Sequence, residues 1–239
     1  MNAPTFQSAV LAVVLLLGGC ANKPPAPDWQ GSAFSALNSF STAYLEGNSR
    51  VADFEFQRAQ AEVARTGRPD LMARLALVRC AVQVASLVLD PCDAFDALAA
   101  DAQPTELNYA LFLSGQWDSV QTDLLPAPYR DWAKPVRAAA QRPAPPDIGT
   151  PANPASASTL AQIKEPQSRL IAAAVLYKSE LIKPVDIALA AETASNQGWR
   201  RPLLAWLGVL HQRAYKAGDA KAAAQLQRRI DLVLQNPAR

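Results

Sequence analysis

The chain has 239 residues, half of them apolar and 18% charged, and its formal net charge is +2. Such a composition excludes a disordered chain and gives no sign of nucleic-acid binding, because it can bury a sizeable core and lacks a basic excess. Alanine is abundant, there are 19 prolines and 10 glycines, and no run of alternating β-branched residues bounded by turns occurs. These features predict an all-α protein.

The first feature along the chain is an apolar run at residues 9–17 that leads into Leu-Gly-Gly-Cys at residues 17–20. About nine residues are too few to cross a bilayer as a helix but suit the apolar region of a secretory signal. Leu-Gly-Gly-Cys resembles the lipobox of bacterial lipoproteins. In that family a peptidase cuts before the cysteine, and the new N-terminus is lipid-modified.

The resemblance implies that residues 1–19 are a signal peptide and that lipidated Cys20 anchors the mature protein to a membrane. Residues 1–8 contain no Lys or Arg, which leaves open a membrane anchor or a core helix instead. Ala21 and Asn22 lack the aspartate that resembles an inner-membrane retention signal in enteric bacteria. The family rule therefore implies a location on the periplasmic side of the envelope, in the outer membrane rather than the inner.

Charge divides the rest of the chain into two halves. Residues 32–124 hold six Arg against twelve Asp or Glu, a net of −6, and residues 125–239 hold sixteen Lys or Arg against eight Asp or Glu, a net of +8. The halves could dock on one another, or each could face a different partner. A third interpretation is that the imbalance is only drift on a solvated surface.

Proline content and helical periodicity divide the chain further. Residues 20–31 read as an extended tether, residues 32–141 as an N-terminal helical region, residues 142–157 as a Pro-rich linker or loop, and residues 158–239 as a C-terminal helical region. Apolar periodicity and capping signals predict the individual helices. They are at residues 33–46, 49–65, 68–88, 92–100, 104–114, 117–124 and 129–141, followed by 158–181, 185–196, 202–217 and 220–234.

Two helix junctions resemble each other in sequence. Ala-Tyr-x-x-Gly occurs at residues 43–47 and again at residues 214–218, and in both copies an alanine follows five residues after the glycine. This pattern is similar to the turn and second helix of a tetratricopeptide repeat, in which Ala-x-x-x-Phe-x-x-Ala follows the turn. The first copy supplies Ala52, Phe56 and Ala59, whereas the second supplies Ala223, Gln227 and Ile230.

The resemblance implies stacked antiparallel helical hairpins, either tetratricopeptide-like or an irregular α-solenoid. Gly115 lies 68 residues after Gly47 and 103 before Gly218, which are close to two and three 34-residue repeats. However, any helical hairpin needs a turn-former and a small residue where its helices touch. The pattern therefore predicts hairpins more firmly than it predicts the family.

Lipidation of Cys20 would leave two cysteines, Cys80 and Cys92, in an exported chain. An even number in an oxidising compartment predicts a disulfide, the alternative being two buried thiols. If the third helix runs to residue 88, the chain must fold back over residues 89–92 to bring the two Cα atoms about 5.5 Å apart.

Chemistry for catalysis is weakly represented. His211 is the chain's one histidine, two cysteines with eleven residues between them do not make a zinc site, and no phosphate or dinucleotide loop occurs. All-α lytic transglycosylases place Ser and an aromatic-Asn-Pro turn after a catalytic Glu, a motif that neither Glu180 nor Glu192 matches. Residues 199–202, Trp-Arg-Arg-Pro, could bind an anion at a helix start or form an exposed turn. We therefore expect no catalytic residue, metal or cofactor.

These observations favour a lipid-anchored envelope protein whose helical hairpins serve as a scaffold or assembly factor for protein partners. The alternatives are a peptidoglycan-active enzyme similar to a lytic transglycosylase and a small-ligand-binding lipoprotein. A cleft with a buried Glu whose pKa is raised would favour the enzyme, a closed apolar cavity the ligand binder, and an open concave face the scaffold.

Overall fold

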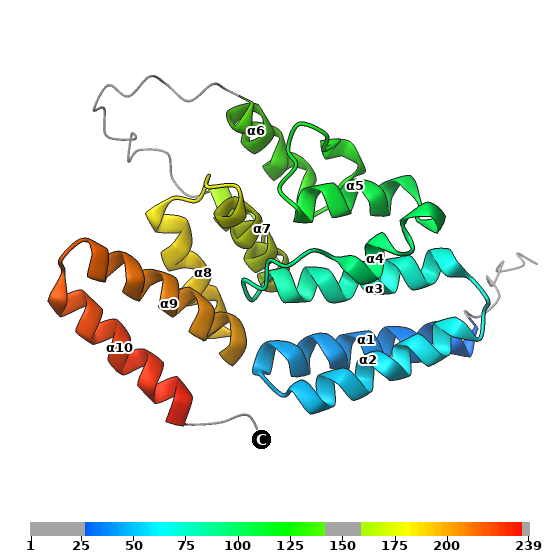
Figure 1. Ribbon diagram of the computed structural model, residues 1–239, viewed down its shortest axis with the longest axis horizontal. Coiled ribbons are helices and arrows are strands. Elements are labelled where there is room, and N and C mark those ends of the chain that lie inside the picture. Colours follow the sequence, from blue (N-terminus) through cyan, green and yellow to red (C-terminus); the bar gives the residue numbers. More distant parts are fainter. Residues whose placement is uncertain (1–26, 142–158, 236–239) are drawn as a thin grey trace, which may run out of the picture.

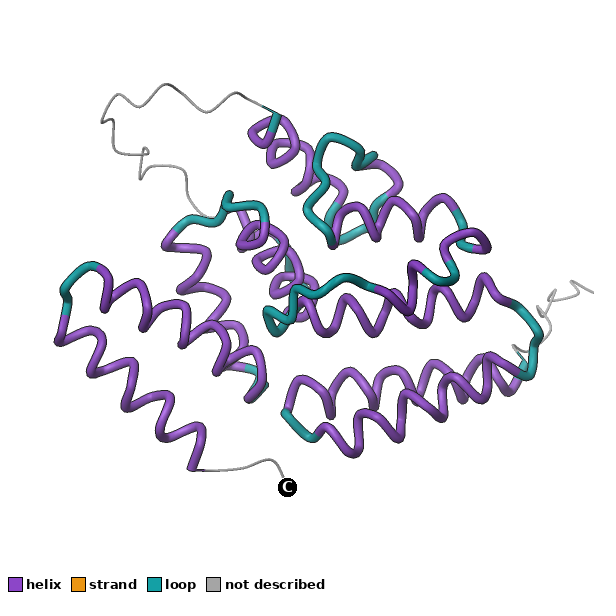
Figure 2. The backbone as a smooth tube through the Cα atoms, viewed as in Figure 1, coloured by secondary structure: helices purple, strands orange, loops and turns teal. Residues whose placement is uncertain are grey.

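The computed structural model describes residues 27–141 and 159–235, and within these ranges every regular element is a helix (Figure 2). The prediction of an all-α fold of stacked helices is confirmed. The α-helices are α1 (Asp28–Glu46), α2 (Ser49–Ala64), α3 (Pro69–Val84), α4 (Asp93–Asp96), α5 (Pro104–Leu113), α6 (Arg130–Ala140), α7 (Pro166–Lys178), α8 (Pro184–Asn196), α9 (Arg200–Lys216) and α10 (Ala220–Gln235). Short 3-10 turns are η1 (Ala99–Asp101), η2 (Thr122–Leu124) and η3 (Thr159–Gln162).

Helices that follow one another in the chain pack side by side. α1 and α2 form a long antiparallel hairpin, and α8, α9 and α10 each pack on the helix before (Figure 1). α1 also contacts α3 and α9, and α3 contacts α5 and α7. The two helical regions therefore meet along α1, α3 and α7.

One hydrophobic core runs through both helical regions. It includes Phe40 of α1, Phe112 of α5 and Trp206 of α9, each 1% exposed or less. Hydrogen bonds also cross between the regions, from the Ser41 hydroxyl to the Gln167 side chain at 2.7 Å and from the Trp117 indole to the Ser179 hydroxyl at 3.0 Å. The regions share one core, while the predicted linker at 142–157 lies outside the described residues.

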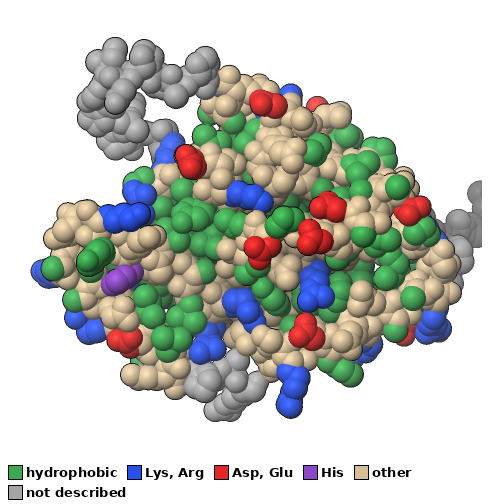
Figure 3. All heavy atoms as spheres, viewed as in Figure 1, with side chains coloured by type: hydrophobic (Ala, Val, Ile, Leu, Met, Phe, Trp, Pro, Cys, Tyr) green, Lys and Arg blue, Asp and Glu red, His purple; other side chains and the backbone are tan. Residues whose placement is uncertain are grey.

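Ion pairs do not hold the oppositely charged halves together. Among the described residues, only Lys134 and Asp123, 3.6 Å apart, form an ion pair between the half ending at residue 124 and the half beginning at residue 125. Basic side chains gather over α9 and α10 on the face seen in Figure 3. Apolar packing and hydrogen bonds therefore join the halves, and much of their charge stays at the surface.

Six of the described helices end in the same backbone motif. A residue in the left-handed conformation follows the helix, and the next backbone N–H donates to a carbonyl five residues earlier, at 2.8 to 3.2 Å. This Schellman motif satisfies carbonyls that a helix end leaves unpaired. The left-handed residues are Gly47, Leu87, Gly115, Glu180, Gly198 and Gly218.

Two predicted boundaries differ most clearly from the structure. α1 begins at Asp28, not at the predicted residue 33, so residues 28–31 are helical and do not belong to an extended tether. Pro27 stands at the N-cap, and Asp28 places a carboxylate at the positive end of the helix dipole. The predicted helix 158–181 is interrupted because Pro166 disfavours helical geometry at Glu165, so α7 begins at Pro166.

Residues 117–124 were predicted to be a helix, and that prediction is wrong except for η2. The Asn108 side chain accepts a hydrogen bond from the Gln121 backbone N–H at 2.7 Å and donates to its carbonyl at 2.9 Å. Gln121 therefore has an extended backbone, and both of its polar groups are paired outside any helix.

Cys80 and Cys92 form a disulfide, as predicted, with Cα atoms 5.8 Å apart. α3 ends at Val84 and not near residue 88, and Leu87 turns the chain back so that Cys92 faces Cys80. The bond closes a short loop and pins the start of α4 to α3. Closing a loop of this length contributes about 3 kcal/mol in the chain-entropy account.

Candidate functional site

The strongest candidate site is a pair of neighbouring cavities that share Val78 of α3; we call this pair the Val78 groove. The first cavity, about 350 Å³, lies between α3, α5 and the segment that leads into α6. The second, about 400 Å³, lies between α1, α3, the start of α7 and the residue before α9. Their lining residues are Arg74, Leu77, Val78, Thr105, Glu106, Tyr109, Leu124, Leu125, Pro126 and Arg130 in the first, and Phe34, Leu37, Asn38, Ser41, Thr42, Leu45, Val78, Gln167 and Trp199 in the second.

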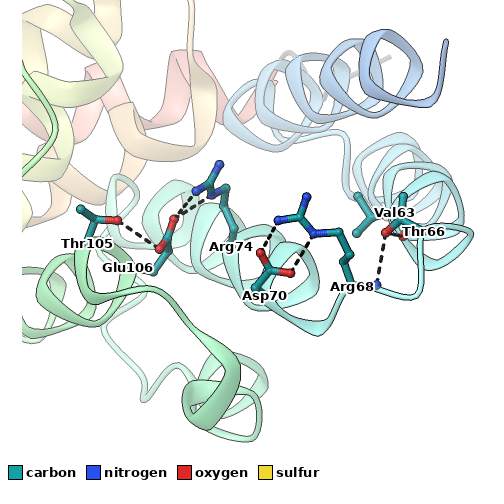
Figure 4. Close-up of polar contacts among 7 residues, drawn as sticks. All are labelled: Val63, Thr66, Arg68, Asp70, Arg74, Thr105 and Glu106. Atoms are coloured by element: carbon teal, nitrogen blue, oxygen red, sulfur yellow. Dashed lines mark hydrogen bonds and ion pairs between the residues drawn. The ribbon is translucent and has the colours of Figure 1, made fainter. Parts of the chain in front are cut away.

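An ion pair between α3 and α5 forms one wall of the first cavity. Glu106 Oε1 accepts from Arg74 Nε at 2.7 Å and lies 2.6 Å from Arg74 Nη2, while the Thr105 hydroxyl donates to Glu106 Oε2 at 3.1 Å (Figure 4). The Glu106 side chain is 9% exposed and that of Arg74 is 58% exposed. Both carboxylate oxygens are therefore engaged, which suits a structural role better than proton transfer.

Figure 4 also shows a second charged pair, between Arg68, which precedes α3, and Asp70 in its first turn. Arg68 donates from Nε and Nη2 to the two Asp70 oxygens, at 3.1 and 2.6 Å, and this hydrogen bonding lowers the pKa of Asp70. Neither residue lines the groove. An exposed pair of this kind adds little to stability, and here it supports the first turn of α3.

Arg130, at the start of α6, also lines the first cavity. Its Nε donates to the Leu125 carbonyl at 2.7 Å, which fixes the plane of the guanidinium while its terminal nitrogens have no ion-pair partner among the described residues. Since the charges of Arg74 and Glu106 cancel, this cavity has a net charge of +1. The site can therefore accept polar or anionic groups above an apolar floor.

Two tyrosines back the first cavity from inside. Tyr109 lines it, and the ring of Tyr129 lies behind with centroids 5.9 Å apart. Burial raises the pKa of Tyr129 to about 12, although hydrogen bonding with Ser168 and Tyr109 opposes the rise. Burial also raises the pKa of Tyr109 well above its usual value. Both phenols stay neutral at physiological pH, so they contribute hydroxyl groups and not charge.

The second cavity has a different character, because its walls are uncharged. Ser41 and Gln167 meet across it, and Asn38 and Thr42 add an amide and a hydroxyl from the same face of α1. Phe34, at 67% exposed, stands at the rim. Amide and hydroxyl groups beside an apolar floor can bind a peptide backbone, which needs donors and acceptors together.

The structure does not bring together the Glu and His residues considered for catalysis. Cys20, the predicted lipidation site, lies outside the described residues. Glu165 caps α7 by accepting from the backbone N–H groups of Gln167, at 2.9 Å, and Ser168. Glu180 is in a turn, and Glu192 and His211 lie on α8 and α9, none of them in the groove. No described group of three or more His, Cys, Asp or Glu side chains could hold a metal ion.

The arginines of the Trp-Arg-Arg-Pro stretch form tertiary contacts instead of a free turn. α9 begins at Arg200, and Arg200 Nε donates to the Val233 carbonyl at 3.2 Å. Arg201 donates to the Tyr44 carbonyl and to the Ser49 hydroxyl, both at 2.7 Å. Only Trp199 of this stretch lines the groove.

Sequence reasoning missed Arg74, Glu106 and Arg130. Each sits in a helical pattern where a charged residue is expected on the solvated side, and Glu106 also looks like an ordinary acidic residue in a first helical turn. No local signal distinguishes them. Only the packing of α3, α5 and the start of α6 around this cavity brings them together.

No protein-family model, curated protein or solved structure matches the chain. Within the described residues, no helix combines the length and apolar character that crossing a membrane requires. The fold and the groove define the class: this is an all-helical protein of stacked helices.

Proposed function

We propose that this protein is a lipid-anchored cell-envelope protein that acts as a helical scaffold or assembly factor, and that it binds a segment of a protein partner in the Val78 groove. Lipid on Cys20 attaches it to the membrane, on the periplasmic side and in the outer membrane. The hairpins are degenerate relatives of tetratricopeptide repeats in this proposal.

The observation that carries the proposal is the groove's composition. It extends over two cavities, joins α1, α3, α5 and α7, and combines an apolar floor with hydroxyl and amide groups. An extended peptide presents side chains and backbone polar groups together, so it can use both. The one carboxylate that lines the groove, Glu106, is nearly buried and is held by Arg74 and Thr105, which favours binding over catalysis.

The lipid anchor rests on residues 17–20 and on the disulfide. Leu-Gly-Gly-Cys supplies the processing signal, and the Cys80–Cys92 bond fits an oxidising compartment. Changing Cys20→Ser should abolish palmitate labelling and leave uncleaved precursor. Equal labelling of both chains would refute the anchor.

Photocrosslinking tests the groove in native membranes. Phe34 lines the second cavity and is 67% exposed, and Phe54 on α2 is 62% exposed but outside both cavities. A photoreactive phenylalanine at position 34 should capture a discrete envelope protein, whereas the same probe at position 54 should not. Ser41→Trp, which fills the second cavity, should remove the position-34 product. Equal capture at both positions would refute the groove as the binding site.

A further inference from the structure

A third cavity, of about 520 Å³, lies next to the disulfide and does not belong to the Val78 groove. It is bounded by the end of α3, the segment through Cys92 into α4, the outer face of α5 and the end of α7. Its floor is apolar and includes Leu89, Phe95 and Leu111. A volume of this size accommodates a small organic molecule.

Acidic side chains stand at the rim of this cavity. Asp90 and Asp96 both line it and are exposed, and neither has a hydrogen bond or ion pair with another described side chain. Figure 3 shows acidic groups beside apolar surface over α4 and the segment before it. Lys178 also lines the cavity, but its ammonium donates to the Leu89 carbonyl at 3.3 Å.

The lining charges sum to −1, from two carboxylates and one ammonium that is already bonded to the backbone. The disulfide contributes to the site because Cys92 lines the cavity and is tied to the buried Cys80. This bond holds the acidic segment against α3 and therefore keeps the cavity's shape in the free protein. A preformed site loses less conformational entropy on binding.

We propose that this cavity binds a small organic cation with an apolar body, the ammonium between Asp90 and Asp96 and the body on the apolar floor. A cation gains attraction from the two carboxylates that a neutral molecule does not, and an anion would meet repulsion from them. This site is independent of the Val78 groove. A failure here would leave the proposed scaffold function untouched.

The experiment uses the full chain in nanodiscs and three probes with one naphthalene body: 2-(naphthyl)ethylammonium, 2-naphthaleneethanol and 2-naphthylacetate. Calorimetry against empty discs gives each Kd. The ammonium should bind at least about tenfold more tightly than the alcohol, and the carboxylate should bind more weakly than the alcohol. The ammonium's advantage should shrink as salt rises, because the carboxylates are exposed.

Three variants decide the interpretation. Asp90→Asn with Asp96→Asn should bring the ammonium to the affinity of the alcohol, while the matched Asp93→Asn, an exposed α4 residue outside the cavity, should leave the difference unchanged. Leu107→Trp, at a 40% exposed lining position, should weaken all three probes. Equal affinity for the three probes, or a preference that survives the double substitution, would overturn the proposal.

Discussion

The α1–α2 and α9–α10 hairpins share a turn sequence but not an environment. Both turns place glycine in the left-handed conformation, Gly47 with φ 93° and Gly218 with φ 72°. In both, the N–H after the glycine donates to the carbonyl of the alanine that opens the motif, at 2.8 Å from Asn48 and 3.0 Å from Asp219. The shared residues therefore specify the same helix end twice.

Beyond the turn the hairpins diverge. α1 packs on α2, α3 and α9, whereas α10 packs mainly on α9. Tyr44 is half-buried under the Arg201 guanidinium, whose carbon lies 4.1 Å from the ring centroid, but Tyr215 is 76% exposed. A local motif thus fixes a turn, and the neighbours in the stack decide which side chains stabilise the protein.

Equivalent positions in the two second helices should give the largest contrast. Phe56 is 3% exposed and its ring lies 5.1 Å from that of Phe40, whereas the equivalent Gln227 is exposed and bonded only to Asp231. Phe56→Ala should lower the free energy of unfolding by about 3–5 kcal/mol. Gln227→Ala should change it by less than about 0.5 kcal/mol, as measured by urea unfolding. Similar losses for both would contradict the comparison.

Removing the disulfide should increase the mobility of the α1–α2 hairpin and leave that of the α9–α10 hairpin nearly unchanged. Cys80→Ala with Cys92→Ala should cost about 3 kcal/mol and loosen α3, which supports α1. Hydrogen exchange should then accelerate in α1 and α3. Exchange in α10 should change little, because a terminal helix opens locally in either chain. Uniform acceleration through α10 would argue against this difference.

Arg201 of α9 makes the polar contacts that connect the α9–α10 hairpin to the α1–α2 hairpin. Arg201→Ala removes two hydrogen bonds to the α1–α2 turn and the contact with Tyr44, which should cost about 1–3 kcal/mol. Arg213→Ala, an exposed arginine on the same helix, is the control and should be near neutral. Equal thermal midpoints for the two variants would show that the Arg201 contacts do not stabilise the protein.

How far the sequence predicted the structure can be judged from the same residues. Helix period, Gly47 and Gly218 predicted both hairpins, because these signals act within a few residues. The disulfide was predicted from the even number of cysteines that lipidation would leave and from the oxidising compartment of an exported chain. The end of α3 was not predicted correctly, because Leu87 adopts a left-handed conformation in which glycine is usually found.

The candidate site could not be predicted in this way. Arg74, Glu106 and Arg130 come from three separate helices, and only tertiary packing brings them to one cavity. Gln121 shows the same limit, because the Asn108 side chain overrides its helical propensity from thirteen residues away. The helical propensity of a segment therefore decides its structure only where no residue distant in the sequence competes for its backbone groups.

A smaller effect is expected where a helix end lacks glycine. Glu180 holds the left-handed position after α7 with φ 58°, in the role of Gly47 and Gly218. The left-handed conformation costs an L-residue roughly 1–2 kcal/mol, and glycine avoids this cost. Glycine also makes the unfolded chain more flexible, which offsets part of the gain. Glu180→Gly should therefore stabilise the protein by about 0.5–1 kcal/mol. Glu192→Gly, exposed inside α8, should instead destabilise it by about 1 kcal/mol. Destabilisation by both would refute the argument.

The smallest effect should appear only at alkaline pH and should distinguish Tyr44 from Tyr215. Burial raises the pKa of Tyr44 above 10.0, and the nearby Arg201 charge opposes part of the rise. The folded state therefore favours the neutral phenol more than the unfolded state does, so this stabilisation is complete below pH 10 and is lost as the pH rises through the folded pKa. Tyr44→Phe has no proton to lose, so its urea midpoint should fall less steeply above pH 10 than that of the wild type. Tyr129, with a pKa of about 12, remains in both chains and cancels in the difference. Tyr215→Phe is the control and should keep the wild-type slope, because the Tyr215 ring is exposed. If the slope flattened equally in both variants, burial would not distinguish Tyr44 from Tyr215.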